Sequence, residues 1–393
     1  MTRRSLLAIA ACLLILAGLP SRSAAQARRL DDGLARTPPM GWNTWNKFAC
    51  DVSEKLIQET ADAMVASGMK DAGYRYLVID DCWQVARDSA GTIVADSVRF
   101  PHGIKAVADY VHARGLSFGI YTDAGTKTCQ GRPGTLDHEV QDARTYAAWG
   151  VDYVKEDWCN ARGLNAPAQY RKFHDALVAT GRPIVLSICE WGSNHPWEWA
   201  AGIGHLWRTT GDIDDSWSSM LTNLDASSAH QAVAGPGGWN DPDMLEVGNG
   251  GMTDDEYRAH LSLWAIVAAP LIAGNDLRSM TPATRDILTN REVLAVDQDP
   301  LGVEGWMVRQ ATPGLQVWSK PLQGGGRAVA LLNRNDTAGA IAVDWRDVGL
   351  RAGPARVRDL WAHADRGVRS GSYSVAVPSH GVVLVTITPV RGR

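Results

Sequence analysis

Short apolar runs alternate with longer amphipathic stretches between about residues 37 and 300. The apolar runs are rich in Val, Ile, Leu or Tyr, and they end at GWN, YLVIDDCW, GIYTDAG, YVKEDWC, SICEWG, WRTTGDID, GGWNDPDM and LIAGNDL. The stretches between them have helical periodicity, for example at 53–73 and 137–150. Alternating strands and helices favour a parallel sheet, and this number of units over about 260 residues is typical of a (β/α)8 barrel.

The pattern changes after residue 300. Short runs of alternating apolar and polar residues, such as GLQVWSKPL and AIAVDWRDV, are separated by Gly, Asn and Asp. This texture is typical of antiparallel strands joined by turns. The sequence therefore predicts an α/β protein: a (β/α)8 TIM barrel at 30–300 and a small C-terminal antiparallel β-sandwich domain at 301–393, which packs against the barrel.

Residues 1–27 combine the pair Arg3-Arg4, a long apolar run, Pro20 and a closing Ala-x-Ala pattern. These features are typical of a signal peptide cleaved after Ala25 or Ala27, with an uncleaved anchor as the alternative. We therefore expect a secreted or periplasmic protein that has no membrane anchor after cleavage. The paired Arg fit twin-arginine export and the apolar run fits the general secretory route, so both routes stay open.

The composition limits the kinds of binding site that the protein can have. Five of the six Cys lie beyond the signal segment, and this odd number suggests two disulfides and one free thiol, although spacing does not reveal the pairing. Because neither C-x-x-C nor H-E-x-x-H occurs, we expect no structural zinc. The net charge of -4 argues against a nucleic-acid partner. The 16 Trp, against 4 Phe, offer flat apolar faces that suit sugar rings.

Acidic residues close most of the predicted strands. In a barrel the carboxyl ends of the strands meet at one face, so these acids would converge there. Helix N-caps are the alternative for any single Asp, but they explain a whole series of strand ends poorly. A metal-dependent hydrolase would need His ligands that the strand ends lack, so we expect no metal and no cofactor. The acids are Asp80, Asp81, Asp123, Asp157, Glu190, Asp212, Asp241, Asp243 and Asp276.

Converging carboxylates without phosphate-binding loops favour glycoside hydrolysis, which needs two carboxyl groups across the glycosidic bond. In the run YVKEDWC, Lys155 and Asp157 share one side of the strand and Glu156 points to the other. A nearby Lys155 should lower the pKa of Asp157, as a nucleophile requires.

The second carboxyl group should come from WRTTGDIDDSW. Asp212, Asp214 and Asp215 crowd together there, and crowding should raise the pKa of one of them enough for a general acid. The spacing alone does not choose among the three. Asp215 precedes Ser-Trp at an apparent helix start, which favours a capping role for it.

Several motifs in this order resemble glycoside hydrolase family 27, the melibiase-type α-galactosidases. The resemblance runs from TPPMGWNTWN at residue 37 through LWAIVAAPLIAGNDL to about residue 302, and VRDLW and VPSHGVVL look like that family's C-terminal domain. It implies a retaining double displacement, with Asp157 as the nucleophile and Asp212 as the acid/base, their carboxyl groups about 5–5.5 Å apart. It also implies disulfides Cys50–Cys82 and Cys129–Cys159, with Cys189 free.

The same resemblance implies the sugar-binding residues. Asp80 and Asp81 would hold the axial 4-OH and the 6-OH of galactose, and Lys155 would bind another hydroxyl. Glu190 and Trp191 look fitted to a free 2-OH. The full set of implied substrate-binding residues is Trp42, Asp80, Asp81, Tyr121, Lys155, Glu190, Trp191, Arg208, Asp243 and Met244.

The sequence thus predicts an exported retaining exo-α-galactosidase that removes terminal α-D-galactosyl residues from galacto-oligosaccharides, galactomannans or galactosides. The alternatives are α-N-acetylgalactosaminidase or β-L-arabinopyranosidase activity on the same scaffold, and a galactose-binding protein without turnover. Its expected partner is a carbohydrate with a terminal α-galactose. One departure from the family stands out: Glu156 precedes the implied nucleophile where many members have an aromatic residue.

Overall fold

The structure is a computed structural model that describes residues 29–390, so the predicted signal peptide lies outside the described residues. Eight parallel strands form one curled sheet in the order β10-β1-β2-β5-β6-β7-β8-β9. Leu245, just after β9, forms a parallel bridge to Ala273 of β10 and closes the sheet into a barrel. All eight predicted strands are confirmed. They are β1 (Met40–Asn43), β2 (Tyr76–Val78), β5 (Ser117–Asp123), β6 (Tyr153–Asp157), β7 (Val185–Cys189), β8 (Leu206–Arg208), β9 (Trp239–Asp241) and β10 (Leu271–Ala273).

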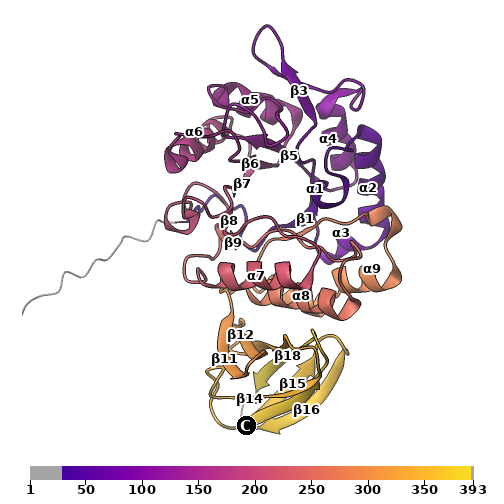
Figure 1. Ribbon diagram of the computed structural model, residues 1–393, viewed down its shortest axis with the longest axis vertical. Coiled ribbons are helices and arrows are strands. Elements are labelled where there is room, and N and C mark those ends of the chain that lie inside the picture. The colour runs from indigo at the N-terminus through magenta and orange to yellow at the C-terminus, as the bar shows by residue number, and fades with distance from the viewer. Residues whose placement is uncertain (1–28, 391–393) are drawn as a thin grey trace, which may run out of the picture.

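Helices surround this ring of strands (Figure 1). The predicted helix at 137–150 is α5, which ends before Gly150 in the left-handed conformation (φ 84°) that glycine favours. The predicted helix at 53–73 is instead two helices, because Gly68 (φ 85°) interrupts it. The helices are α1 (Trp45–Phe48), α2 (Glu54–Ala66), α3 (Met69–Ala72), α4 (Gly103–Ala113), α5 (Glu139–Trp149), α6 (Ala166–Val178), α7 (Trp217–Ser228), α8 (Asp254–Ile266), α9 (Pro282–Leu288) and α10 (Arg291–Asp297), with 3-10 turns η1 (Pro196–Glu198) and η2 (Leu277–Ser279).

One element of the barrel was not predicted. The hairpin of β3 (Gln84–Arg87) and β4 (Ile93–Ala95) follows β2 and projects from the side of the barrel opposite the C-terminal domain (Figure 1). Its alternation is too short and too interrupted by Asp, Ser and Gly to stand out in the sequence. Within residues 29–390, no helix is both long and apolar enough to cross a membrane.

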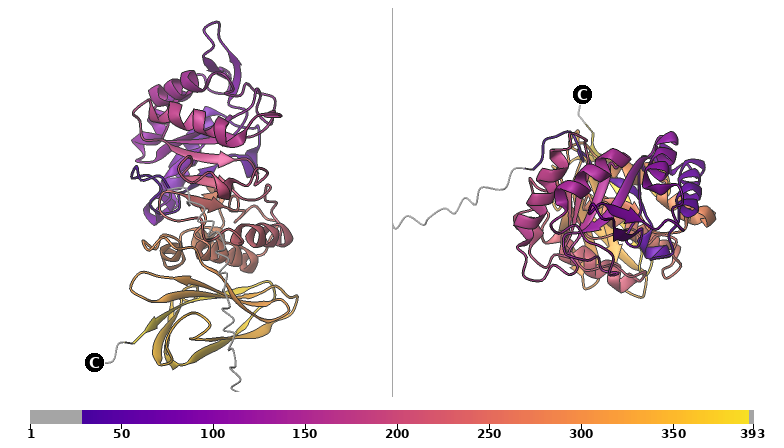
Figure 2. Two further views of the ribbon diagram at one scale, coloured as in Figure 1. Left: turned by 90° about the vertical axis from the view of Figure 1, so that its left-hand side faces the viewer. Right: turned by 90° about the horizontal axis from the view of Figure 1, so that it is seen from above.

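The C-terminal part is antiparallel, as predicted. One sheet has the order β11-β12-β13-β18-β15-β16, and β14 pairs with β17 in a second sheet across a shared apolar core. This domain packs against the side of the barrel that carries α7 and α8 (Figure 2). Its strands are β11 (Trp306–Thr312), β12 (Leu315–Pro321), β13 (Arg327–Asn333), β14 (Gly339–Asp344), β15 (Pro354–Asp359), β16 (Ala364–Ser370), β17 (Ser372–Val377) and β18 (Val382–Pro389).

A buried charge joins the two domains. Lys320 of β12 is fully buried, and its Nζ donates to the carbonyl oxygens of Ala265 and Asp297, both at 3.1 Å. Asp297 and Glu304 are buried beside it, and burial raises the pKa of both carboxyl groups while the Lys320 ammonium opposes that rise. Removing the cation would leave buried acids uncompensated, so this contact ties the fold of one domain to that of the other.

The outer face of β6 carries a buried acidic side chain. Glu156 is fully buried between β6 and the helices, and neither of its carboxyl oxygens has a hydrogen-bond partner among the described residues. Burial, together with Asp123 and Glu139, holds the pKa of Glu156 well above its usual range. Glu139 itself is paired with Lys172 at 2.8 Å, so no cation is left for Glu156. The side chain is therefore a neutral acid in the folded protein at neutral pH.

Glu156→Gln should stabilise the protein increasingly as the pH rises. Because the folded-state pKa of Glu156 lies above its unfolded value, the wild type loses stability as pH rises from the unfolded pKa toward the folded one. The variant has no such proton to lose. Its advantage in the free energy of unfolding should grow by up to about 1.4 kcal/mol per pH unit, measured by urea unfolding between about pH 5 and about pH 8.

Glu198→Gln is the matched control, because the Glu198 side chain is 68% exposed and should show no such pH-dependent gain. A constant difference between Glu156→Gln and wild type at every pH would contradict the assignment of a neutral Glu156.

Candidate active site

A cavity of about 590 Å³ opens at the carboxyl ends of the barrel strands. This volume lies in the range of small-molecule sites. Most of the residues that the sequence pointed to line it together: Asp80, Asp81, Tyr121, Lys155, Asp157, Trp191, Arg208, Asp212, Asp243 and Met244.

Asp157 lies at the end of β6 and is nearly buried. Its Oδ2 accepts a hydrogen bond from the Tyr121 hydroxyl at 3.1 Å, and its Oδ1 accepts one from the backbone N–H of Trp158 at 3.0 Å. Burial raises the pKa of Asp157 to about 6, although Lys155 opposes the rise. Lys155 lowers the pKa of Asp157 as expected, but desolvation has the larger effect and the net direction is upward.

Lys155 is bonded to a different acid. Its Nζ donates to Oδ2 of Asp80 at 2.9 Å, and Nδ2 of Asn43 donates to the same oxygen at 2.8 Å. The backbone N–H of Asp80 donates to the Thr44 hydroxyl. Asn43 and Thr44 were missed as site residues, although they follow β1 in the quoted motif GWNT. They fix the orientation of Asp80 toward the cavity.

Asp81 is held by backbone groups. Its Oδ1 accepts from the N–H of Cys82 at 2.6 Å, and its Oδ2 accepts from the N–H of Gln130 at 2.9 Å. Burial raises the pKa of this carboxyl group against those hydrogen bonds. Asp80 and Asp81 thus present two differently supported carboxyl groups to one side of the cavity.

Arg208, at the end of β8, binds two acids. Its guanidinium donates to Oδ1 of Asp212 at 2.9 Å and forms an ion pair with Asp243 at 3.0 Å. Burial raises the pKa of Asp212, but Arg208 and Lys155 outweigh it, and the net direction is downward. The expected rise of an acid in this cluster does not occur at Asp212, because Arg208 and Lys155 outweigh the effect of burial there.

The neighbouring Asp215 has a structural position. It accepts hydrogen bonds from the N–H of Gly251 and the hydroxyl of Tyr257. The predicted capping role of Asp215 is wrong, because Ser216 is the N-cap of α7 and accepts from the N–H of Ser219. The bonds of Asp215 tie the segment that follows Asp212 to the start of α8.

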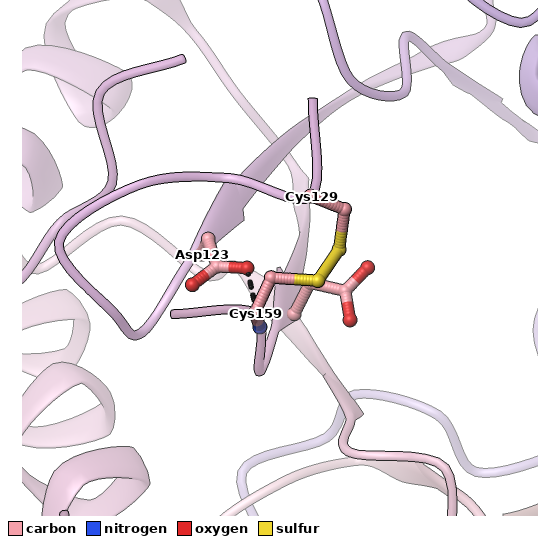
Figure 3. A group of neighbouring side chains, drawn as sticks. Asp123, Cys129 and Cys159 are labelled. Atoms are coloured by element: carbon pink, nitrogen blue, oxygen red, sulfur yellow. Dashed lines mark hydrogen bonds between the residues drawn. A yellow bond between two sulfur atoms is a disulfide. The ribbon is translucent and has the colours of Figure 1, made fainter. Parts of the chain in front are cut away.

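Both disulfides are confirmed: Cys50 is bonded to Cys82, and Cys129 is bonded to Cys159. Cys189 is free and buried. Figure 3 shows Asp123 beside the second disulfide, with its carboxylate accepting from the N–H of Cys159.

Asp157 also lies beside that disulfide. Potential ligand atoms of Asp123, Asp157 and the two cysteines lie within 4.8 Å of one another, but the sulfurs are bonded to each other. They therefore cannot act as two thiolate ligands, and this cluster is a poor metal site.

Two predicted residues do not line the cavity. Trp42 is fully buried, and its indole N–H donates to the carbonyl of Asn275 at 2.7 Å. Glu190 is buried as well, and its Oε2 accepts from the side-chain and backbone nitrogens of Asn194. Burial raises the pKa of Glu190 to about 7. Of the pair expected at the 2-OH of the sugar, only Trp191 faces the cavity.

The rest of the cavity wall comes from α1 and from loops, and of its residues the sequence pointed only to Asp214, Asp215 and the disulfide-bonded Cys129. Asn46 donates to Glu246, and Asn249 donates to the same carboxyl group at 2.6 Å. Several wall residues have positive φ, including Trp191 (57°) and Asp243 (87°). Such strained backbone is common at functional sites, and no pattern in the sequence predicts it. The additional residues are Trp45, Asn46, Lys47, Ala49, Cys129, Ile213, Asp214, Asp215, Glu246 and Asn249.

Two carboxyl groups of the cavity differ in burial and in the direction of their pKa shifts. Asp157 is buried and its pKa is raised, whereas Asp212 is 67% exposed in its side chain and its pKa is lowered. Pairs of acids whose environments push their pKa values apart are typical of acid/base chemistry. Hydroxyl-binding carboxylates and an ammonium beside them suit a sugar better than an apolar ligand.

Comparison with known proteins agrees with this chemistry. The family model described as "Alpha galactosidase A" matches residues 37–299, and the model of the "Alpha galactosidase C-terminal beta sandwich domain" matches residues 312–387. The α-galactosidase of Cyamopsis tetragonoloba is 49% identical over 362 residues, 91% of this chain and 88% of that protein. Human α-galactosidase A is 46% identical over 357 residues, 84% of this chain and 82% of that protein.

Solved structures show the same architecture. α-Galactosidase I from Mortierella vinacea superposes with a TM-score of 0.88 at 40% identity, covering 91% of this chain and 98% of that one. The Saccharomyces cerevisiae α-galactosidase, solved with raffinose, also has a TM-score of 0.88, at 32% identity over 91% of this chain and 99% of that one. The chain therefore belongs to glycoside hydrolase family 27, the melibiase-type α-galactosidases, and is a glycoside hydrolase of the α-galactosidase kind.

Proposed function

We propose that the protein is an exported, retaining exo-α-galactosidase. The observation that carries this proposal is the pair of carboxyl groups, Asp157 and Asp212, that line one cavity at the carboxyl ends of the barrel strands. Export is supported by the signal-like segment 1–27 and by two disulfides, which persist in oxidising compartments.

In the first step, Asp157 attacks the anomeric carbon from the face opposite the leaving group. The bond to the glycosidic oxygen breaks, and that oxygen takes the proton of Asp212. The products of this step are the free leaving group and a galactosyl ester of Asp157 with inverted configuration. Tyr121, which donates to Asp157 at 3.1 Å, stabilises the carboxylate and orients it before attack.

In the second step, Asp212 removes a proton from water as the water attacks the anomeric carbon. The ester bond to Asp157 breaks, and galactose leaves with its original α configuration. Asp80, held by Lys155 and Asn43, and Asp81, held by backbone N–H groups, accept hydrogen bonds from hydroxyls of the sugar. The supporting bonds of these carboxylates limit their movement, so the sugar is positioned at little entropic cost.

Wild type should release α-galactose first from 4-nitrophenyl α-D-galactopyranoside, as proton NMR of the early reaction would show. Asp157→Asn should lose at least about four orders of magnitude in kcat, because no carboxylate remains to form the ester. The N-acetylgalactosaminide and arabinopyranoside analogues serve as substrate controls. Faster hydrolysis of either analogue, or β-galactose as the first product, would contradict the proposal.

Asp212→Asn should lose about 10²- to 10⁴-fold on substrates with poor leaving groups and much less on activated aryl galactosides. Azide should partly restore its turnover, because an anion needs no general base to attack the ester. The galactosyl azide formed should have α configuration. Asp214→Asn is the matched neighbour and should lose less than about tenfold. Equal losses at both positions, or β-galactosyl azide from Asp212→Asn, would reassign the acid/base.

The pH profile should be bell-shaped with its maximum on the acid side. Activity requires an ionised Asp157 and a protonated Asp212, although the isolated pKa directions favour the proton on Asp157. The pair must therefore share one proton, and this state disappears as pH rises through about 6. Measured kcat/KM should fall above that pH, with folding checked by fluorescence at each point. A plateau extending well into the alkaline range would be incompatible with this proton sharing.

A further inference from the structure

Asp123 is a strand-end acid to which the proposed mechanism gives no role. It is the last residue of β5, and the register of the two parallel strands pairs it with Asp157 at the end of β6. Its side chain is fully buried and does not line the catalytic cavity, so it cannot touch a sugar that is bound there. Any contribution of this acid to the reaction must therefore pass through other residues.

The Asp123 carboxyl group joins the loops that follow β5 and β6. Its Oδ1 accepts a hydrogen bond from the N–H of Gly125 at 2.7 Å. Its Oδ2 accepts one from the N–H of Cys159 at 2.8 Å (Figure 3). Cys159 follows Asp157 closely in the β6 loop. One side chain at the end of β5 thus fixes the backbone on the C-terminal side of the proposed nucleophile.

Further contacts from β5 and its loop hold the nucleophile itself. The N–H of Ala124 donates to the carbonyl oxygen of Asp157 at 2.9 Å. The hydroxyl of Tyr121, also on β5, donates to the Asp157 carboxylate at 3.1 Å. The two loops approach so closely that a Cβ on Gly125 would lie 2.1 Å from the carbonyl oxygen of Cys159. The β5 side of the site therefore holds the carboxylate, the carbonyl group and the following backbone of the nucleophile.

The carboxyl groups of Asp123 and Asp157 also share one desolvated region. An oxygen of one lies within 4.8 Å of an oxygen of the other, and two carboxylates at this distance would repel each other. Burial raises the pKa of Asp123 to about 8, with a contribution from the charge of Asp157, and burial raises the pKa of Asp157 to about 6. Asp157 therefore ionises first, and the neutral Asp123 still has oxygen lone pairs for its two N–H donors.

We propose that Asp123 is a positioning residue for the nucleophile: by tying the backbone after Asp157 to β5, it keeps the Asp157 carboxylate in the orientation that attacks the anomeric carbon. This inference rests on the proposed function, in which Asp157 forms the galactosyl ester. A nucleophile displaced by about 1 Å can lose about 10²-fold in rate. The Asp80 carboxylate is held by Asn43 and Lys155, so galactose should bind without the Asp123 tie.

Asp123→Ala should lower kcat/KM for 4-nitrophenyl α-D-galactopyranoside about 100-fold per folded molecule, because the backbone after the nucleophile loses its tie to β5. Calorimetry should show that the variant binds galactose within about twofold of wild type. Asp123→Asn keeps one of the two acceptors and should lose about tenfold in kcat/KM, again with unchanged galactose affinity. If Asp123→Ala does not fold, Asp123→Asn decides by the same comparison.

Asp152→Ala is the matched control. Asp152 ties the same two strands at their ends away from the cavity, where its Oδ2 accepts from the N–H of Phe118 at 2.9 Å. Its loss should lower the free energy of unfolding in urea and leave kcat/KM within about twofold of wild type. A purely structural role for Asp123 would give this same pattern, so the contrast between the two positions separates positioning from stability.

A measurement without substrate separates this inference from the proposed mechanism. Amide hydrogen exchange at Cys159 should be at least about tenfold faster in Asp123→Ala than in wild type, because its acceptor is lost. An unchanged exchange rate, wild-type kcat/KM in folded Asp123→Ala, or equal losses in kcat/KM and galactose affinity would overturn the inference. So would an equal loss of kcat/KM in Asp152→Ala. Wild type inactive on every galactoside would overturn the proposed function instead, while the exchange measurement would still decide whether Asp123 ties the two loops.

Discussion

The site depends on two cations, the buried Arg208 and the partly buried Lys155, that hold several neighbouring carboxylates together. Lys155 binds Asp80, and Arg208 binds both Asp212 and Asp243, at distances of 2.9 to 3.0 Å. Without these cations the strand ends would carry mutually repelling acids in a desolvated cavity, and protonation would neutralise several of them. Arg208 lowers the pKa of Asp212, whereas Lys155 offsets only part of the rise that burial causes in the pKa of Asp157.

The C-terminal domain contributes to this arrangement at a distance. Asp212 lies in a segment that Asp215 ties to Gly251 and Tyr257 at the start of α8. The other end of α8 supplies Ala265, whose carbonyl accepts from the buried Lys320 of the β domain. The segment that carries the exposed acid is thus anchored to a helix whose own position depends on the domain interface. The small domain is part of the support of the catalytic cavity, even though the residues that line the cavity all belong to the barrel.

The strands and most cavity residues were predictable, because the carboxyl ends of all the strands of a barrel meet at one face. The periodicity gave all eight strands, and the family resemblance gave both disulfide pairings. The periodicity did not separate α2 from α3, because one glycine in the left-handed conformation interrupts an otherwise continuous pattern. The sequence also did not predict the position of Glu190 or the directions of the pKa shifts at Asp157 and Asp212. They depend on hydrogen bonds to Asn194 and on the balance of burial against Arg208, which arise only when distant segments meet.

Strand β6 shows how strongly register constrains this protein. Lys155 pairs with Tyr121 and Ser187, and Asp157 pairs with Asp123 and Cys189, so two neighbouring strands fix which side chains face the cavity. A slip of one residue would exchange that set for Glu156 and Trp158. These two residues have their own requirements on the outer side, where one is a neutral buried acid and the other stacks on Tyr170. Both faces of one short strand therefore select the same register, the inner face through an ion pair and the outer face through burial and stacking.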